Sequence, residues 1–348
     1  MLNELYFIIP GDLATLTGGY IYDRRLLLSL RAQGLAVHHV QLPGHYPRPT
    51  SEHLVQAEQI FADLPDDALV LVDGLAYGVL PHIAARERER LRLIELCHHP
   101  LALETGLSDA EAAELHESEQ AALEHARAVV VTSKGTARLL RELFGVEDTK
   151  ITVALPGTEP QDFSPCRGDP PLLLTVASLT KRKAHHILIA ALAQLRHLPW
   201  RARFVGGAHF DPEWSAALRQ QVVEAGLNER IEFVAEKQDL RAEYHHADLF
   251  VLPSLFEGYG MVFSEALAAG LPIVAARAGA VPEVVPPKAG ILVPPGEVQA
   301  LATALQELLI NPERRRQLQR GARAAAAGLP RWDDTARIVR QVLEAVAE

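Results

Sequence analysis

The chain has 348 residues, more than a single hydrophobic core usually serves, so two domains are expected. Apolar residues make up 48% of the sequence and charged residues 22%, a composition typical of a globular protein. The net charge of −10 argues against general binding to nucleic acid. The sequence contains no uninterrupted apolar run of about 18 residues, so no membrane span is predicted.

The N-terminus lacks the basic segment, apolar core and cleavage site of a secretory signal, so none is predicted. Two cysteines, Cys97 and Cys166, are too few for a disulfide framework. Free thiols are typical of a reducing compartment. These features together favour a cytoplasmic protein.

Short apolar runs alternate with helical patterns along the first half of the chain. Strands are predicted at 4–9, 36–41, 69–73, 92–97, 128–132 and 150–154. The clearest helices are predicted at 19–32, 108–126 and 134–144. The stretch 156–171 holds five prolines and two glycines and is interpreted as a linker.

The alternation then restarts. Strands are predicted at 172–176, 202–206, 231–234, 248–252, 272–275 and 290–293, and the last helices at 297–310, 312–326 and 331–346. Strands that alternate with helices indicate a parallel sheet. Two such series predict an α/β protein with two Rossmann-like domains.

The most informative stretch is PSLFEGYGMVFSEALAAGLPIV, which begins at Pro253. A buried strand is predicted before it, a turn at its glycines, a helix from Met261 to Ala269, and then another strand. Ligands of such sheets gather at the carboxyl ends of the strands. Glu257 falls in that loop, and Glu265 lies about one turn into the helix.

Carboxylates accept hydrogen bonds from sugar hydroxyls, and free amides at a helix start bind phosphate. The two features together favour a nucleotide-sugar as the ligand of this loop. The alternative is an ordinary strand-to-helix loop whose glycines only make the turn.

The spacing Glu-x7-Glu inside PSxxEGxGxxxxEAxAxGxP resembles the signature of glycosyltransferase family 4, retaining enzymes with the GT-B fold. The resemblance extends along most of the chain, through the segments TGGYIYDRRLLLSLRAQGLAVHHV, ARAVVVTSKGTARLL, LLLTVASLTKRKAHHILIAALAQL, GAVPEVV and RWDDTARIVRQVLEAV. It implies two Rossmann-like domains facing across a cleft. Residues 1–165 would bind the acceptor, residues 166–330 would bind the donor, and helix 331–348 would cross back to the first domain.

The resemblance also implies roles for the residues of this stretch. Glu257 would hold hydroxyls of the donor hexose, and Glu265 would hold the ribose diol. Backbone amides of 258–262 would meet the sugar and diphosphate. The full predicted donor-binding set is Gly18, Gly19, Ser178, Lys183, Glu257, Gly258, Tyr259, Gly260, Met261, Val262 and Glu265.

Lys183 is the predicted phosphate ligand, because it follows a strand and precedes an amphipathic helix. The family pattern there is Gly-Arg-Leu-x-x-x-Lys-Gly. This chain has Ser178 in place of the arginine and alanine in place of both glycines. Lys181 or Arg182 can supply the missing charge. We expect the Glu257 carboxylate and the Lys183 ammonium to converge, and the alternative is three solvated basic residues on a loop.

The histidines of Cys97-His98-His99-Pro100 follow a predicted strand, and the resemblance implies one histidine near the reacting sugar. His99 aligns best and His98 is the alternate, so the predicted catalytic residues are His99, Lys183 and Glu257. No metal is predicted. Adjacent histidines face different ways, and the chain has no Asp-x-Asp motif.

The sequence therefore predicts a metal-independent retaining hexosyltransferase that uses a UDP- or GDP-sugar and no other cofactor. The acceptor would be a glycan, lipid-linked or small-molecule hydroxyl, and peripheral contact with the inner membrane face is compatible with this. Two alternatives stay open. One is a sugar-nucleotide epimerase or hydrolase of the same fold, and the other is a non-catalytic nucleotide-sugar binder.

Overall fold

The computed structural model describes residues 4–348, which divide into two compact units. Unit 1 comprises Met1–Gly157 and Pro330–Glu348, and unit 2 comprises Thr158–Leu329. The first boundary thus falls after residue 157, whereas the sequence placed it after residue 165. The return of the chain to unit 1 falls within one residue of the predicted position.

Backbone contacts explain the earlier boundary. The Ser164 N–H donates to the carbonyl of Ala269, and its hydroxyl donates to the carbonyl of Ala247. The Gly168 N–H donates to the buried Asp248 carboxylate. The proline-rich stretch is therefore fixed along unit 2 by hydrogen bonds, a tertiary feature that its composition did not indicate.

Unit 1 is built on a six-stranded sheet in which every neighbouring pair is parallel, as predicted. Its strand order is β2-β1-β3-β4-β5-β6. The strands are β1 (Glu4–Pro10), β2 (Ala36–Leu42), β3 (Leu69–Asp73), β4 (Arg92–Cys97), β5 (Ala128–Val131) and β6 (Ile151–Val153).

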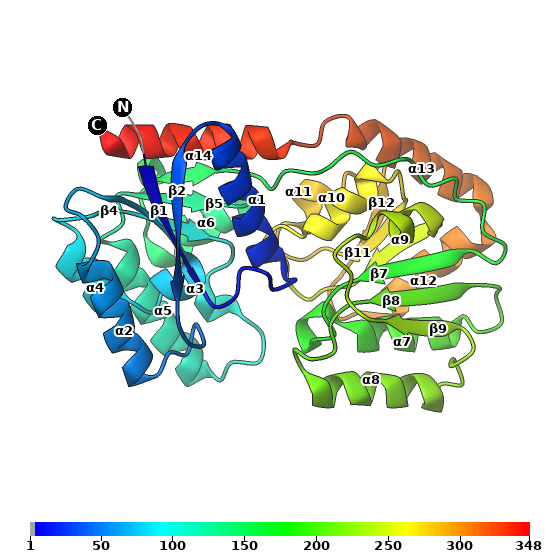
Figure 1. Cartoon of the computed structure of the whole chain (residues 1–348). Helices are drawn as coiled ribbons and strands as arrows, with labels where there is room; N and C mark the ends of the chain where they lie inside the picture. The colour runs from blue at the N-terminus through cyan, green and yellow to red at the C-terminus, as the bar shows by residue number, and fades with distance from the viewer. Residues whose placement is uncertain (1–3) are drawn as a thin grey trace. The chain divides into compact units, whose positions relative to one another are not determined.

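Helices cover both faces of this sheet, because successive strand residues point to opposite faces and both are apolar. One face carries a core shared with α2, α4, α5 and α6. On the other face α1 packs beside α14, the C-terminal helix drawn in red in Figure 1. The helices are α1 (Gly18–Ala32), α2 (Ser51–Ala62), α3 (Gly74–Tyr77), α4 (Pro81–Glu87), α5 (Asp109–Leu123), α6 (Lys134–Phe144) and α14 (Trp332–Ala347).

Unit 2 repeats the architecture with a second parallel six-stranded sheet, ordered β12-β11-β10-β7-β8-β9. Its strands are β7 (Leu172–Val176), β8 (Arg201–Val205), β9 (Ile231–Val234), β10 (Leu249–Leu252), β11 (Ile273–Ala276) and β12 (Gly290–Val293). Its helices are α7 (His185–Gln194), α8 (Pro212–Glu224), α9 (Arg241–His246), α10 (Met261–Ala268), α11 (Val281–Val284), α12 (Val298–Ile310) and α13 (Pro312–Ala326). The predicted α/β class and the return of the last helix to the first domain are confirmed.

Each sheet has a point where the strand order reverses, and such points are where open α/β sheets bind ligands. In unit 1 the reversal lies between β1 and β3, and in unit 2 between β7 and β10. The loops after these strands are therefore the places to look for a site. Among residues 4–348, the helices are all too short or too polar to cross a bilayer.

Candidate functional site

In unit 2 the loops that follow β7 and β10 meet at the reversal point and bring Lys183 against Glu257. The Lys183 Nζ donates to Glu257 Oε1 at 2.7 Å. Lys183 is the last residue of a 3₁₀ turn, Lys181–Lys183, that leads into α7, so it lies just before the predicted helix. Ala184 follows in a left-handed conformation, and only then does α7 begin. The expected convergence of the carboxylate and the ammonium is thus present.

Arg182 brings a second positive charge to the same carboxylate. Its NH1 atom lies 3.7 Å from Glu257 Oε2 and donates to the carbonyl of Phe256 at 3.1 Å. The Leu255 N–H donates in return to the Arg182 carbonyl at 2.8 Å. These contacts fasten the β7 loop to the β10 loop, so Lys183 lies at Oε1 of Glu257 and Arg182 lies near Oε2.

Lys181 lies elsewhere, with its ammonium 5.7 Å from the centre of the Trp214 ring. Ser178 lies partly buried at the start of the loop, where its carbonyl accepts the Thr180 N–H at 2.9 Å. Of the two residues that could replace the charge missing at Ser178, Arg182 is the one beside Glu257.

Glu257 is only 5% exposed, yet it carries a charge. Burial alone would raise the pKa of its carboxyl, but the Lys183 ammonium and then the Arg182 guanidinium outweigh burial and hold this pKa below its usual value. At neutral pH the site therefore contains a carboxylate flanked by two cations. An ionised acceptor beside fixed positive charge suits a ligand that has both hydroxyl groups and phosphates.

The glycine turn after Glu257 places backbone amides at the start of α10. Gly260 has a φ of 84°, a left-handed value that a residue with a Cβ rarely adopts. Helix α10 then begins at Met261, as predicted, and its first N–H groups have no partner within the helix. The backbone of Glu257 is fixed by a hydrogen bond, because its carbonyl accepts the Ala280 N–H at 2.9 Å.

Glu265 lies one turn into α10, and its Oε2 accepts the hydroxyl of Tyr244 at 2.7 Å. Tyr244 is fully buried and packs on Phe250 of β10, with ring centres 6.0 Å apart. The tyrosine thus fixes the rotamer of Glu265 from the core. Sequence reasoning missed Tyr244, and only its aromatic character within a short helical pattern could have indicated it.

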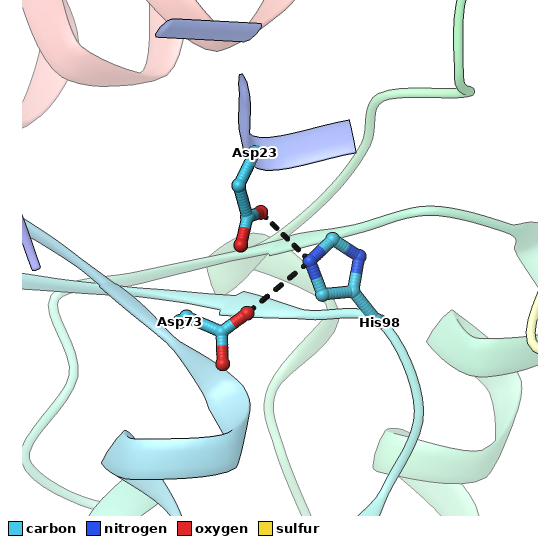
Figure 2. A group of neighbouring side chains, drawn as sticks. All are labelled: Asp23, Asp73 and His98. Carbon is cyan, nitrogen blue, oxygen red and sulfur yellow. Dashed lines mark hydrogen bonds and ion pairs between the residues drawn. The ribbon is translucent and has the colours of Figure 1, made fainter. Parts of the chain in front are cut away.

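A second group of polar side chains lies at the reversal point of the unit 1 sheet. His98 follows β4, Asp73 ends β3, and Asp23 lies in α1. The His98 Nε2 is 2.8 Å from Asp23 Oδ1 and 3.4 Å from Asp73 Oδ2 (Figure 2). Asp23 is 0% exposed and Asp73 is 2% exposed. We call these three residues the histidine clamp.

The glycine pair predicted at the start of α1 adjoins this clamp. Helix α1 begins at Gly18. A Cβ on Gly19 would lie 3.3 Å from Cδ2 of the His98 ring, so the histidine packs against bare backbone there. The structure therefore brings Gly19 together with His98, the alternate, and gives His98 the two aspartate contacts. His99 is also partly exposed, and its predicted catalytic role stays a prediction.

The clamp holds a proton on His98. Burial alone would lower the pKa of the His98 ring, but Asp23 and then Asp73 outweigh burial and raise it to about 10. Burial raises the pKa of Asp23 to about 7, so the shared proton resides on the ring.

A third cluster of acidic groups is fully buried beneath the same sheet edge, where atoms of Glu95, Cys97 and Glu119 lie within 4.8 Å of one another. Burial raises the pKa of Glu95 well above its usual value, and the neighbouring Glu119 and Asp73 raise it further. Burial likewise raises the pKa of Glu119 to about 8. These carboxyls are therefore protonated in the folded chain at pH values where the unfolded chain has ionised them.

This cluster predicts that unit 1 loses stability as the pH rises. Because the folded chain binds more protons, its free energy of unfolding falls between about pH 4.5 and about pH 8. We expect Glu95→Gln to make the fall shallower, since one of the groups no longer ionises. The measurement is the melting temperature across this pH range. Glu89→Gln serves as the control because Glu89 is 87% exposed, and an equal slope in both variants would contradict the assignment.

Two parallel sheets of this connectivity, each with polar loops at its reversal point, define the GT-B class of α/β proteins. Comparison with known families agrees. Residues 12–157 match the glycosyl transferase 4-like domain, and residues 159–325 match the glycosyl transferases group 1. The chain belongs to the glycosyltransferases of the family 4 type.

Individual relatives are also named as glycosyltransferases. The chain is 32% identical over 278 residues to a D-inositol 3-phosphate glycosyltransferase of Nocardia farcinica, a match that covers 72% of this chain and 60% of the relative. It is 34% identical over 159 residues to a GDP-mannose-dependent alpha-(1-6)-phosphatidylinositol monomannoside mannosyltransferase of Mycolicibacterium smegmatis, covering 42% and 41%. The chain thus spans about three fifths or less of the length of these curated relatives.

Among solved structures, sucrose-phosphate synthase from Thermosynechococcus elongatus superposes with a TM-score of 0.82 at 25% identity. That match covers 99% of this chain and 100% of the other. The whole described architecture, including the return of α14 to unit 1, therefore has a counterpart in a family of known fold.

Proposed function

We propose that this protein transfers a hexose from a nucleotide-diphosphate sugar to a hydroxyl acceptor, with retention of the anomeric configuration. The observation that carries the proposal is the contact of Lys183 with Glu257 at the reversal point of the unit 2 sheet. A buried carboxylate that can accept sugar hydroxyls lies there beside two cations that can neutralise a diphosphate.

Each group has a distinct task in this proposal. Glu257 accepts hydrogen bonds from hydroxyls of the donor hexose. Lys183 and Arg182, with the first amides of α10, stabilise the negative charge that gathers on the departing phosphate. Glu265, oriented by Tyr244, accepts the ribose hydroxyls. The transition state resembles an oxocarbenium ion, so charge stabilisation of the leaving group is the main demand on the protein.

We further propose that the reaction needs no metal ion, because two side-chain cations lie beside Glu257, where the diphosphate is proposed to bind. Unit 1 would bind the acceptor. The curated relatives act on inositol phosphate and on a phosphatidylinositol mannoside by name, so a phosphorylated polyol and a lipid-linked glycan are the first acceptors to test.

One assay tests the proposal. The purified chain is incubated with UDP- and GDP-hexoses, with and without these acceptors, and free nucleotide and product mass are followed. We expect nucleotide release that depends on the acceptor, survives EDTA and yields a product of retained configuration by NMR. Release without an acceptor would indicate a hydrolase or epimerase, binding without release would indicate a non-catalytic binder, and a strict Mg²⁺ requirement would contradict the charge model.

The two remaining basic residues of the 3₁₀ turn give a matched pair of variants. We expect Arg182→Gln to lower kcat/KM by about ten- to a hundredfold, since a hydrogen bond to a charged group contributes about 1.5–3 kcal/mol. Lys181→Gln should change it by less than about threefold, because its ammonium lies over Trp214 and not beside Glu257. The measurement is the initial rate at varied donor concentration for both variants. A larger loss of kcat/KM in Lys181→Gln than in Arg182→Gln would assign the second phosphate-binding charge to Lys181.

A further inference from the structure

The histidine clamp engages only one of the two ring nitrogens of His98. Its Nε2 faces both carboxylates, while the other nitrogen, Nδ1, points away from them (Figure 2). The two aspartates come from different elements, α1 and the end of β3. Because their positions are set independently by the fold, they fix both the place and the direction of the ring.

Packing prevents the ring from turning over. The Tyr22 ring meets the His98 ring edge-on, with centres 5.1 Å apart, and the Tyr22 hydroxyl is itself tied to the Ala154 carbonyl at 2.9 Å. The backbone of Gly19 lies against the ring at Cδ2. A 180° flip of the ring would put the carbon Cε1 in place of Nε2 against Asp23 and leave a buried carboxylate without its hydrogen bond.

The charges around the ring agree with this arrangement. Asp23 is fully buried and reaches the ring from α1, and Asp73 reaches it from β3. Glu95 of β4 and Tyr20 of α1 are the next titratable groups that interact with these aspartates. Two carboxylates at Nε2 require a proton on that nitrogen, since a bare Nε2 would face them with a lone pair. Their two negative charges also favour the second proton, on Nδ1, which makes the ring an imidazolium.

We propose that Asp23 and Asp73 are positioning residues that keep His98 as a fixed imidazolium, whose Nδ1–H donates to an oxygen of the bound substrate. His98 then cannot act as a base toward the acceptor hydroxyl, because both of its nitrogens already carry protons. The role rests on the proposed function, whereas the charge state does not. If His98 were neutral, it could act as a general base. Because the clamp keeps the ring protonated, His98 can only donate a hydrogen bond.

The charge state is tested by ¹⁵N NMR of the ring nitrogens in the full chain, with exposed His82 of α4 as an internal reference. In the wild type we expect both His98 nitrogens to keep imidazolium shifts beyond about pH 8. Asp23→Asn and Asp73→Asn should each lower the His98 midpoint by roughly 1–3 units. Ordinary titration of His98 in the wild type would overturn the proposal without any variant.

Transfer kinetics test the positioning role. We expect the kcat of the wild type to show no ionisation near pH 6.5, and Asp23→Asn to acquire one, with activity lost as the pH rises through it. Asp63→Asn, on the exposed end of α2, is the matched control. A pH profile unchanged in Asp23→Asn would refute the positioning role. If no transfer is found with any donor, the proposed function fails. The NMR experiment still tests the charge state of His98, because it does not depend on transfer activity.

Discussion

Replacing Glu257 by glutamine should abolish most of the transfer activity while leaving the fold intact. The amide keeps the shape of the side chain but loses the negative charge that is proposed to accept hydrogen bonds from sugar hydroxyls. The loss of one charged hydrogen bond corresponds to about 3 kcal/mol, so kcat/KM should fall roughly a hundredfold. Glu229→Gln, an exposed change in the same unit, should leave the rate unaltered. Wild-type kinetics for Glu257→Gln would remove the role assigned to this residue.

The same variant has a signature in stability. Glu257 is paired with Lys183 while nearly fully buried, and removal of one partner of a buried pair costs about 3–5 kcal/mol. The pKa of Glu257 is lower in the folded chain than in the unfolded chain. The stabilisation is therefore present above the pKa of the unfolded carboxyl and lost as the pH falls through that of the folded one. The melting temperatures of wild type and variant should converge in acid, so circular dichroism at the assay temperature must accompany the kinetics.

Replacing Lys183 by methionine should reduce turnover by about 10²–10³-fold, the cost of removing one preorganised group that stabilises developing charge. Methionine keeps the length and apolar stem of the side chain, so loss of charge dominates the effect. Affinity for UDP or GDP, measured by calorimetry, should fall in parallel, because the ammonium is proposed to bind the diphosphate. Lys288→Met, an exposed change, is the control.

The outcome for Lys183 is informative in either direction. Arg182 reaches the same carboxylate, so a variant at Lys183 that keeps its rate while Arg182→Gln loses it would transfer the principal phosphate role to the arginine. Full activity in both single variants would contradict stabilisation of the leaving group by protein cations. The double variant Lys183→Met/Arg182→Gln then measures how far the two charges act as a unit.

The fold could be predicted because local patterns and tertiary structure agree along this chain. The strand before Glu257 is a continuous apolar run, the glycines mark the turn, and a buried helix follows, so β10 and α10 were found within one residue at each end. The meeting of Lys183 with Glu257 follows from the strand order, since β7 and β10 are neighbours at the reversal point of the unit 2 sheet and their loops leave the same edge.

The remaining parts of the site depend on contacts that no local pattern records. Asp23 occupies one position of the buried face of α1, where sequence reasoning expects apolar residues, and nothing nearby marks it as a partner of a histidine 75 residues away. The end of β4 was predicted correctly, yet it does not decide between His98 and His99. Adjacent side chains point in different directions, and only the tertiary contacts with Asp23 and Asp73 distinguish His98. Tyr244 similarly gains its meaning only from its contact with Glu265.

Because α14 belongs to unit 1 although it is the last helix of the chain, the order of synthesis and the order of assembly differ in this protein. Unit 2 is continuous, so it can complete its core without α14. The sheet of unit 1 is translated first, yet it lacks the helix that packs beside α1 until residues 332–347 have been released. A chain that ends at residue 329 should therefore leave unit 1 open to a protease while unit 2 stays protected.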